Sequence, residues 1–207
     1  MEAFTVCTGI AATLPQANVD TDVIMPKQFL KGITREGLAG GLFYDLRFDE
    51  AGRERPDFVL NRRDYRATTF LVVGPNFGCG SSREHAVWGL RQFGIRALIG
   101  LGYASIFYDN CIRNGLLPIV LSAEAHGRVL AACAEGAPAR VTVDLVRGIV
   151  RVEDRLSIPF SIDARERDDL LNGRDAIAAT LQLAPAIDAF QRRLHAAAPW
   201  LRPSSPA

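Results

Sequence analysis

The pattern of hydrophobic and polar positions becomes regular in the middle of the chain, from residue 68 onward. Three continuous apolar runs follow one another there, each succeeded by a stretch whose apolar positions repeat at helical spacing. Apolar runs without alternation are typical of strands that are buried on both faces. The pattern predicts strands at residues 68–73, 96–101 and 116–121, and helices at residues 82–93, 104–114 and 124–135.

Strands that alternate with helices predict a parallel sheet with right-handed crossovers and helices on its faces. Upstream, we expect a strand or hairpin at residues 4–14 and a short strand at residues 19–25, which carries Asp20 and Asp22. Residues 45–66 are rich in arginine and acidic residues, which suits a solvent-exposed excursion. Downstream, we expect strands at residues 140–145, 148–152 and 158–162, and helices at residues 165–171, 174–181 and 184–197.

The composition is that of one ordinary globular domain. The chain has 207 residues, of which 48% are hydrophobic and 23% are charged, and its formal net charge is +1. We therefore expect an α/β protein with a largely parallel central sheet, helices packed around it and a helical C-terminal region. Residues 1–198 are expected to form this single domain, and the proline-containing residues 199–207 a flexible tail.

Charge and hydropathy argue against two kinds of partner. Nucleic acid is a poor candidate because neutralising phosphates needs clustered lysine and arginine, and the sequence has no long basic run. A bilayer span needs ~20 predominantly apolar residues, whereas polar residues interrupt the uncharged segment 3–19. Glu2 stands where a signal peptide would carry positive charge. We expect no membrane association and a cytoplasmic location.

The four cysteines, Cys7, Cys79, Cys111 and Cys133, are widely separated, so the chain contains no C-x-x-C motif. An iron–sulfur cluster is usually held by three or four thiolates, at least two of which are close in sequence. We therefore expect this chain to bind no metal or cofactor of its own, and each cysteine to be a small buried residue.

Candidate chemistry is concentrated at residues 78–85, between the first buried strand and the helix that follows it. Gly78 and Gly80 allow positive φ and a close approach of the backbone to a ligand. Ser81, Ser82 and Arg83 then place two hydroxyls and a guanidinium at a helix start, where unpaired N–H groups favour a carboxylate or a phosphate.

A structural interpretation of the same residues competes with this one. Ser81 and Glu84 have the spacing of a capping box, in which the two side chains satisfy backbone donors reciprocally. In that case Arg83 is a solvated charge and His85 a half-buried residue that supports the turn. A dinucleotide-binding loop, a phosphate-binding loop and a hydrolase nucleophile elbow all need residues that this turn lacks.

The turn and several further segments resemble the isopropylmalate dehydratase small subunits of the aconitase superfamily. Asn76 to Ala86, read as N-F-G-C-G-S-S-R-E-H-A, is similar to the signature of the superfamily's swivelling domain. The resemblance covers residues 4–195 and extends to these further segments: N-V-D-T-D-V-I-M-P-K-Q-F-L at 18–30, L-F-Y-D at 42–45, R-F at 47–48, P-D-F-V-L-N at 56–61, I-F-Y at 106–108, N-G-L-L-P at 114–118 and D-x-I-x-x-T-L at 175–181.

The resemblance implies a single swivelling β/β/α domain that isomerises 2-isopropylmalate and 3-isopropylmalate by dehydration and rehydration in leucine biosynthesis. It also implies a large-subunit partner, in a heterodimer or heterotetramer, that carries a [4Fe–4S] cluster. By the same resemblance Ser81 is the catalytic base, and the residues that bind a small dicarboxylate substrate are Ser82, Arg83, Asp22, Lys31 and Arg35. Support for the turn is then expected from Gly78, Gly80, Glu84 and His85.

Two other functions remain open at this point. Gly32 stands where many members of the family carry a second basic residue, so the substrate could be another substituted malate, such as methylmalate with citraconate as its dehydration product. A non-catalytic anion-binding module that uses the turn as a helix cap is a remoter alternative. We also expect the isolated chain to be inactive, because the turn alone stabilises a serine alkoxide too weakly.

Overall fold

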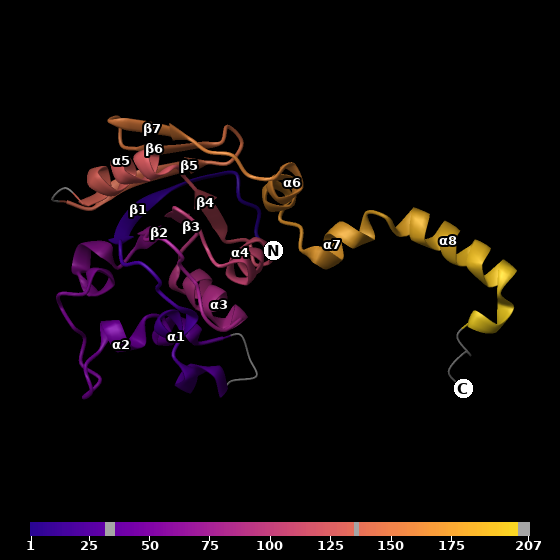
Figure 1. Ribbon diagram of the computed structural model, residues 1–207, viewed down its shortest axis with the longest axis horizontal. Helices are drawn as coiled ribbons and strands as arrows, with labels where there is room; N and C mark the ends of the chain where they lie inside the picture. The colour runs from indigo at the N-terminus through magenta and orange to yellow at the C-terminus, as the bar shows by residue number, and fades with distance from the viewer. Residues whose placement is uncertain (32–35, 135–136, 203–207) are drawn as a thin grey trace.

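The computed structural model describes residues 1–31, 36–134 and 137–202, and it is built around one curled sheet of seven strands (Figure 1). The strand order is β4-β3-β2-β1-β5-β6-β7. The strands are β1 (Val6–Leu14), β2 (Thr68–Val73), β3 (Ala97–Gly100), β4 (Leu117–Val120), β5 (Ala139–Asp144), β6 (Ile149–Val152) and β7 (Leu156–Pro159).

Strand β1 joins two differently built halves of the sheet. On one side it pairs in parallel with β2, and β3 and β4 continue the parallel arrangement. On the other side β1 pairs antiparallel with β5, and β6 and β7 follow as an antiparallel meander. The expected α/β fold class is confirmed, with the parallel strands forming the half that carries the predicted turn.

The burial of each half follows its sequence. Strand β2 reads T-T-F-L-V-V, and its alternate residues enter two hydrophobic clusters on opposite faces, Leu71 and Val73 in one, Phe70 and Val72 in the other. Strand β5 instead alternates buried and exposed positions, because only one of its faces is covered.

Helices cover both faces of the parallel half. Helices α3 (Glu84–Phe93) and α4 (Ser105–Arg113) contribute to one cluster, and α5 (Ala123–Ala134) and α6 (Ala164–Asn172) to the other. The remaining helical segments are α1 (Thr21–Ile24), α2 (Tyr44–Arg47), α7 (Ala176–Leu181), α8 (Ala184–Ala197) and the 3₁₀ turns η1 (Lys27–Lys31), η2 (Leu38–Gly41), η3 (Val59–Asn61), η4 (Arg63–Tyr65) and η5 (Pro199–Leu201).

Two local predictions, for residues 19–25 and for His126, are wrong, as is the expected burial of Cys7 and Cys79, which are both partly exposed. Residues 19–25 do not form a strand: Asp20 caps the short helix α1 by accepting a hydrogen bond from Val23 N at 2.8 Å, so Asp20 and Asp22 do not share one face of a strand. His126, expected at the surface, is buried on α5, where its Nε2 lies 2.9 Å from the carbonyl oxygen of Val73 at the end of β2. Both outcomes depend on contacts with segments remote in the sequence.

The C-terminal helices stand apart from the sheet. Figure 1 shows α7 and α8 extending away from the body of the protein beyond α6, and every residue in these two helices is at least partly exposed. We refer to residues 176–201 as the C-terminal arm. No helix in the described part of the chain is long and apolar enough to cross a membrane.

Candidate active site

The residues between β2 and α3, 74–83, form what we call the site turn. The N-terminal segment lies alongside this turn: Gly78 N donates to Val19 O at 2.8 Å, and Thr21 N donates to Cys79 O at 2.9 Å. Thr21, which is buried, also donates through Oγ1 to the carbonyl oxygen of Ser81 at 2.7 Å. The backbone of the site turn is therefore fixed by hydrogen bonds to a segment about sixty residues earlier in the chain.

Gly78 is required for a close approach of the turn to α4. Its φ is +76°, and a Cβ atom at this position would lie 2.1 Å from the ring of Phe107. Gly80 also has a positive φ, of +85°. A side chain at position 78 would strain the backbone and clash with a buried ring, so the structure of the turn requires glycine there.

Helix α3 begins without a side-chain cap, and the capping-box interpretation is therefore wrong. Its N-cap residue is Arg83, and Glu84 is the first helical residue, so Ser81 and Glu84 do not have the positions that a capping box needs. The N-cap residue of helix α4, Ala104, likewise provides no side-chain cap. Two uncapped helix starts thus face the same region, and each offers backbone N–H groups to an anion.

The two supporting residues after Arg83 contact other side chains. Glu84 Oε1 accepts a hydrogen bond of 2.7 Å from Asn114 Nδ2, while Trp88 Nε1 donates to Asn114 Oδ1 at 3.0 Å. The His85 ring lies against Trp88, with 4.7 Å between the ring centroids. The first turn of α3 is thereby held to the end of α4, consistent with a supporting position for both residues.

Arg83 and Asp22 form an ion pair at the edge of the site. The Arg83 side chain is only 13% exposed, whereas that of Asp22 is 41% exposed. The hydrogen bond from Arg83, together with the charges of Arg83 and Lys27, holds the pKa of Asp22 below its usual value. The guanidinium is thus oriented by a carboxylate of the chain itself.

These elements enclose a cleft of about 160 Å³. Its walls are the site turn, the start of α3 and the start of α4. Ligand pockets usually measure ~300–1,000 Å³, so the cleft is too small to be a complete small-molecule site. The residues that line it are Thr21, Gly78, Gly80, Ser81, Ser82, Arg83, Ala104, Ser105, Ile106 and Phe107.

The structure brings most of the predicted site residues together. Ser81, Ser82 and Arg83 line the cleft. Asp22 does not line it, but forms an ion pair with Arg83. Arg35 and the side chain of Lys31 lie outside the described residues.

Sequence reasoning missed three contributors: Thr21, Asn114 and the start of α4. The last could have been found, because the ends of neighbouring parallel strands meet at one edge of a sheet. Ala104 N indeed donates to Phe77 O at 3.2 Å.

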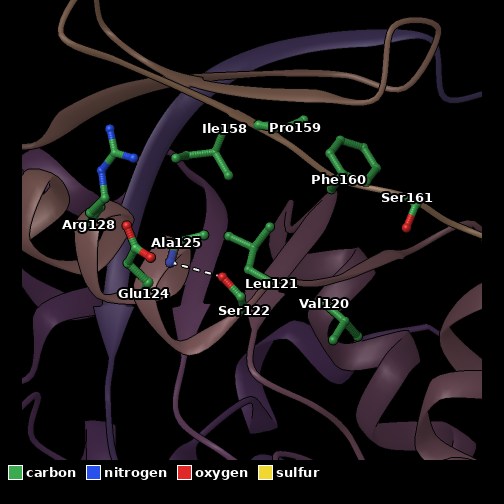
Figure 2. Close-up of a pocket in the computed structure, with 10 residues that line it drawn as sticks. All are labelled: Val120, Leu121, Ser122, Glu124, Ala125, Arg128, Ile158, Pro159, Phe160 and Ser161. Atoms are coloured by element: carbon green, nitrogen blue, oxygen red, sulfur yellow. Dashed lines mark hydrogen bonds between the residues drawn. The ribbon is translucent and has the colours of Figure 1, made fainter.

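A larger cleft lies elsewhere. Figure 2 shows it between the end of β4, the first turns of α5 and residues 158–161, with a volume of about 570 Å³. Its drawn hydrogen bond, from Ala125 N to Ser122 Oγ, is a helix cap, and its charged side chains, Glu124 and Arg128, are exposed. The smaller cleft is the better candidate site because hydroxyls, a buried guanidinium and two uncapped helix starts converge on it.

Metal ligands do not cluster in the part of the chain that the structure describes: no group of three or more His, Cys, Asp or Glu residues there could hold a metal ion. The thiols of Cys111 and Cys133 are buried, and burial raises the pKa of both, that of Cys133 to about 11. These two thiols therefore disfavour the thiolate form that metal binding requires.

Comparison with known proteins places this site in a class. Residues 1–124 match the family model of the aconitase C-terminal domain. Residues 177–204 match the family model of the C-terminal domain of the 3-isopropylmalate dehydratase small subunit. Fold and site together thus define an α/β domain of the aconitase type.

Individual relatives narrow the class. The 3-isopropylmalate dehydratase small subunit of Phenylobacterium zucineum is 53% identical over 97% of this chain and 98% of its own length, and that of Rhodospirillum centenum is 51% identical over 97% and 98%. A crystal structure of 3-isopropylmalate dehydratase from Methanocaldococcus jannaschii superposes with a TM-score of 0.64 and 25% identity, covering 90% of this chain and 99% of that one. The chain belongs to the family of 3-isopropylmalate dehydratase small subunits, which confirms the resemblance.

Proposed function

We propose that the chain is the small subunit of a cytoplasmic hydro-lyase that interconverts 2-isopropylmalate and 3-isopropylmalate in leucine biosynthesis, together with a large subunit that carries a [4Fe–4S] cluster. The observation that carries the proposal is the convergence of Ser81, Ser82 and Arg83 on one cleft at two uncapped helix starts. This site is built for an anion next to a hydroxyl, which is the chemistry that a malate substrate needs.

Arg83 and Ser82 bind a carboxylate of the substrate in this proposal. A guanidinium that is largely removed from water donates strongly to a carboxylate, and the start of α3 adds a partial positive charge. Asp22 acts through Arg83: it holds the guanidinium in position, and because it is itself an anion it is better suited to orienting Arg83 than to touching a dicarboxylate.

As an alkoxide, Ser81 Oγ takes the proton from the carbon next to the bound carboxylate, and the C–H bonding pair forms the double bond. The hydroxyl leaves the neighbouring carbon as hydroxide with the C–O bonding pair, so the proton held at Ser81 and the hydroxide together make up the water that is removed. Rehydration in the opposite orientation returns the proton from Ser81 and moves the hydroxyl to the other carbon. The cluster, when bound in the partner, supplies Lewis-acid chemistry for the leaving hydroxyl.

The magnitudes explain why a partner is required. Lowering the pKa of a serine hydroxyl by many units costs ~1.4 kcal/mol for each unit. A helix start contributes ~0.3–2 kcal/mol and one preorganised donor about 3 kcal/mol. The small cleft also leaves the reacting atoms open to water. Closure by a second subunit supplies the missing walls, so the isolated chain is expected to show no turnover.

The cluster is assigned to the partner because the cysteines of this chain are dispersed over β1, the site turn, α4 and α5, as Cys7, Cys79, Cys111 and Cys133. Of these, the two on helices are buried thiols with raised pKa values. A cubane cluster needs three or four thiolates at one place.

The test is reconstitution with the large subunit from the same organism, after anaerobic loading of the cluster. Ser81→Ala is expected to lower turnover by about 10²–10⁴-fold, the usual contribution of a general base. Its matched control is Ser122→Ala, which removes another exposed serine hydroxyl at a helix start, outside the cleft, and should cost only ~1 kcal/mol of stability.

Substrate choice is measured with the same complex on a panel of malates. Isopropylmalate should be the preferred substrate; preference for methylmalate and citraconate would contradict the assigned reaction while keeping the site. Undiminished turnover by the Ser81→Ala complex would show that the serine is not the base.

A further inference from the structure

The C-terminal arm presents an apolar stripe to solvent. The stripe begins at Leu183, the N-cap residue of α8, and continues in the helix with Ile187, Phe190 and Leu194, at spacings of four, three and four residues. Side chains at these spacings lie on one face of a helix, as in the seam of a helix pair. Phe190 is 56% exposed, so the body of the protein does not cover the stripe.

Further exposed apolar side chains lie in the elements that flank α8. On the side of the body, Ile177 and Leu181 are four residues apart in α7, and both are exposed. At the far end, Trp200 in η5 is 79% exposed. The opposite face of α8 carries Arg192, which is also exposed. An amphipathic helix with large side chains left in water is typical of a docking element.

The arm leaves the body beside the candidate active site. A cleft of about 450 Å³ at its root is lined by Ala176 and Ile177 of α7 and also by Glu84, the first residue of α3. Glu84 directly follows Arg83, so the arm starts next to the site turn. On the rim of the active-site cleft, Ile106 is another exposed apolar side chain, 54% exposed. A protein that closes over the site turn therefore lies within reach of the arm.

The size of the stripe argues against pairing with a second copy alone. Helix α8 has 14 residues and is thus about 21 Å long and ~10 Å wide. One face presents on the order of 200 Å², whereas each partner contributes ~800 Å² to a stable interface of typical size. The stripe is large enough to take part in a stable interface only if a larger contact surface adjoins it. The surface around the active-site cleft can provide that larger contact.

We propose that the C-terminal arm lays its apolar stripe on the large subunit that also covers the site turn. This inference rests on the proposed function, because it takes its partner from there. It adds a second attachment point outside the active site, with Ile187 and Phe190 as the central anchors. Apart from Ala176, the arm lies within residues 177–204, the segment that matches a family model specific to these small subunits.

The test measures binding and turnover separately. The full chain carrying Ile187→Glu together with Phe190→Glu should fold normally, since both side chains are exposed, and should bind the large subunit with a Kd raised roughly a hundredfold, as expected for two central anchors. Circular dichroism and thermal unfolding check the fold. The control Arg192→Glu introduces glutamate on the opposite face with the same change in net charge as the double variant, and should leave Kd within a factor of about two.

The outcomes separate this proposal from the proposed function. Unchanged binding by the double variant overturns the docking role, whatever the activity. If the wild-type pair binds but does not convert isopropylmalate, the proposed function fails, while loss of binding by the double variant still supports docking. A wild-type chain that sediments alone as a dimer, and becomes monomeric in the double variant, would show that a second copy covers the stripe and would overturn the proposal.

Discussion

The helix starts at the candidate site differ from those of α6 and α7. Helix α6 is capped by Asp163, whose Oδ1 accepts hydrogen bonds from Arg165 N at 2.9 Å and Glu166 N at 3.2 Å, and α7 is capped by Asp175 in the same manner. Helices α3 and α4 have Arg83 and Ala104 as their N-cap residues, and neither residue provides a side-chain cap. A capped start has already used its donors, whereas an uncapped start keeps them for a ligand.

The difference explains why a conspicuous serine at a helix start is not evidence of a cap. Ser81 lies three residues before Glu84 and reads as a cap in sequence, yet the helix starts later and leaves the hydroxyl in an open cleft. Substitution should therefore lower stability at the capped starts of α6 and α7, and lower turnover at the two uncapped starts beside the cleft. The following predictions test this division, beyond the substitutions at Ser81 and on the arm.

The largest effect on stability is expected at Gly78. Gly78→Ala places a methyl group against the Phe107 ring and forces alanine into positive φ, which together should cost about 3 kcal/mol of unfolding free energy. The control is Gly127→Ala in α5, where a Cβ meets no atom within 4 Å; it should stabilise the protein by about 0.5–1 kcal/mol. Urea unfolding measures both. Equal stabilities would mean that the turn is looser than its geometry indicates.

A smaller effect is expected at the capped start of α6. Asp163→Ala removes the acceptor for two backbone N–H groups and should lower the free energy of unfolding by ~1 kcal/mol. Turnover of the reconstituted complex should not change, because Asp163 is not part of the active-site cleft. A loss of turnover without a loss of stability at this position would contradict the assignment of capped helix starts to stability and of the uncapped starts at the cleft to catalysis.

The smallest effect concerns the Arg83–Asp22 pair and depends on pH. Because the folded-state pKa of Asp22 is lowered, its contribution to stability is fully present above the unfolded-state pKa, near 3.8, and is lost as the pH falls through the lower folded value. Asp22 is partly exposed, so the contribution should be below about 1 kcal/mol.

Unfolding of the wild type and of Asp22→Asn, followed from pH 7 to pH 2, checks this. The difference between the two should be constant at neutral pH and should disappear at acid pH. A difference that grows as the pH falls would have the wrong sign for a carboxylate that is stabilised in its charged form.

Much of the fold could be predicted locally. Strand β2 and helix α8 have the predicted bounds, because an unbroken apolar run and a helical apolar repeat are both periodic signals within a short window. The glycines of the site turn could also be recognised in the sequence as a turn. Few residues other than glycine tolerate a positive φ so close to a neighbouring ring.

Other features could not be read from any window. The segment at residues 19–25 looked like a strand because of its valine and isoleucine, but hydrogen bonds from Thr21 to Cys79 and Ser81 fix it as a capped helical turn. His126 is buried because the carbonyl oxygen of Val73, at the end of its strand, accepts its hydrogen bond. Both effects come from partners more than fifty residues away.

Residue type and short-range spacing were enough to predict the alternating strands and helices and the family, and to propose residues 78–85 as the place of the chemistry. Folding in three dimensions decided the rest: that Ser81 is not a cap, that Asp22 holds Arg83, that the start of α4 joins the cleft and that the arm stands free of the body. Hydrogen bonds and packing between distant segments set these features, and no local pattern carries them.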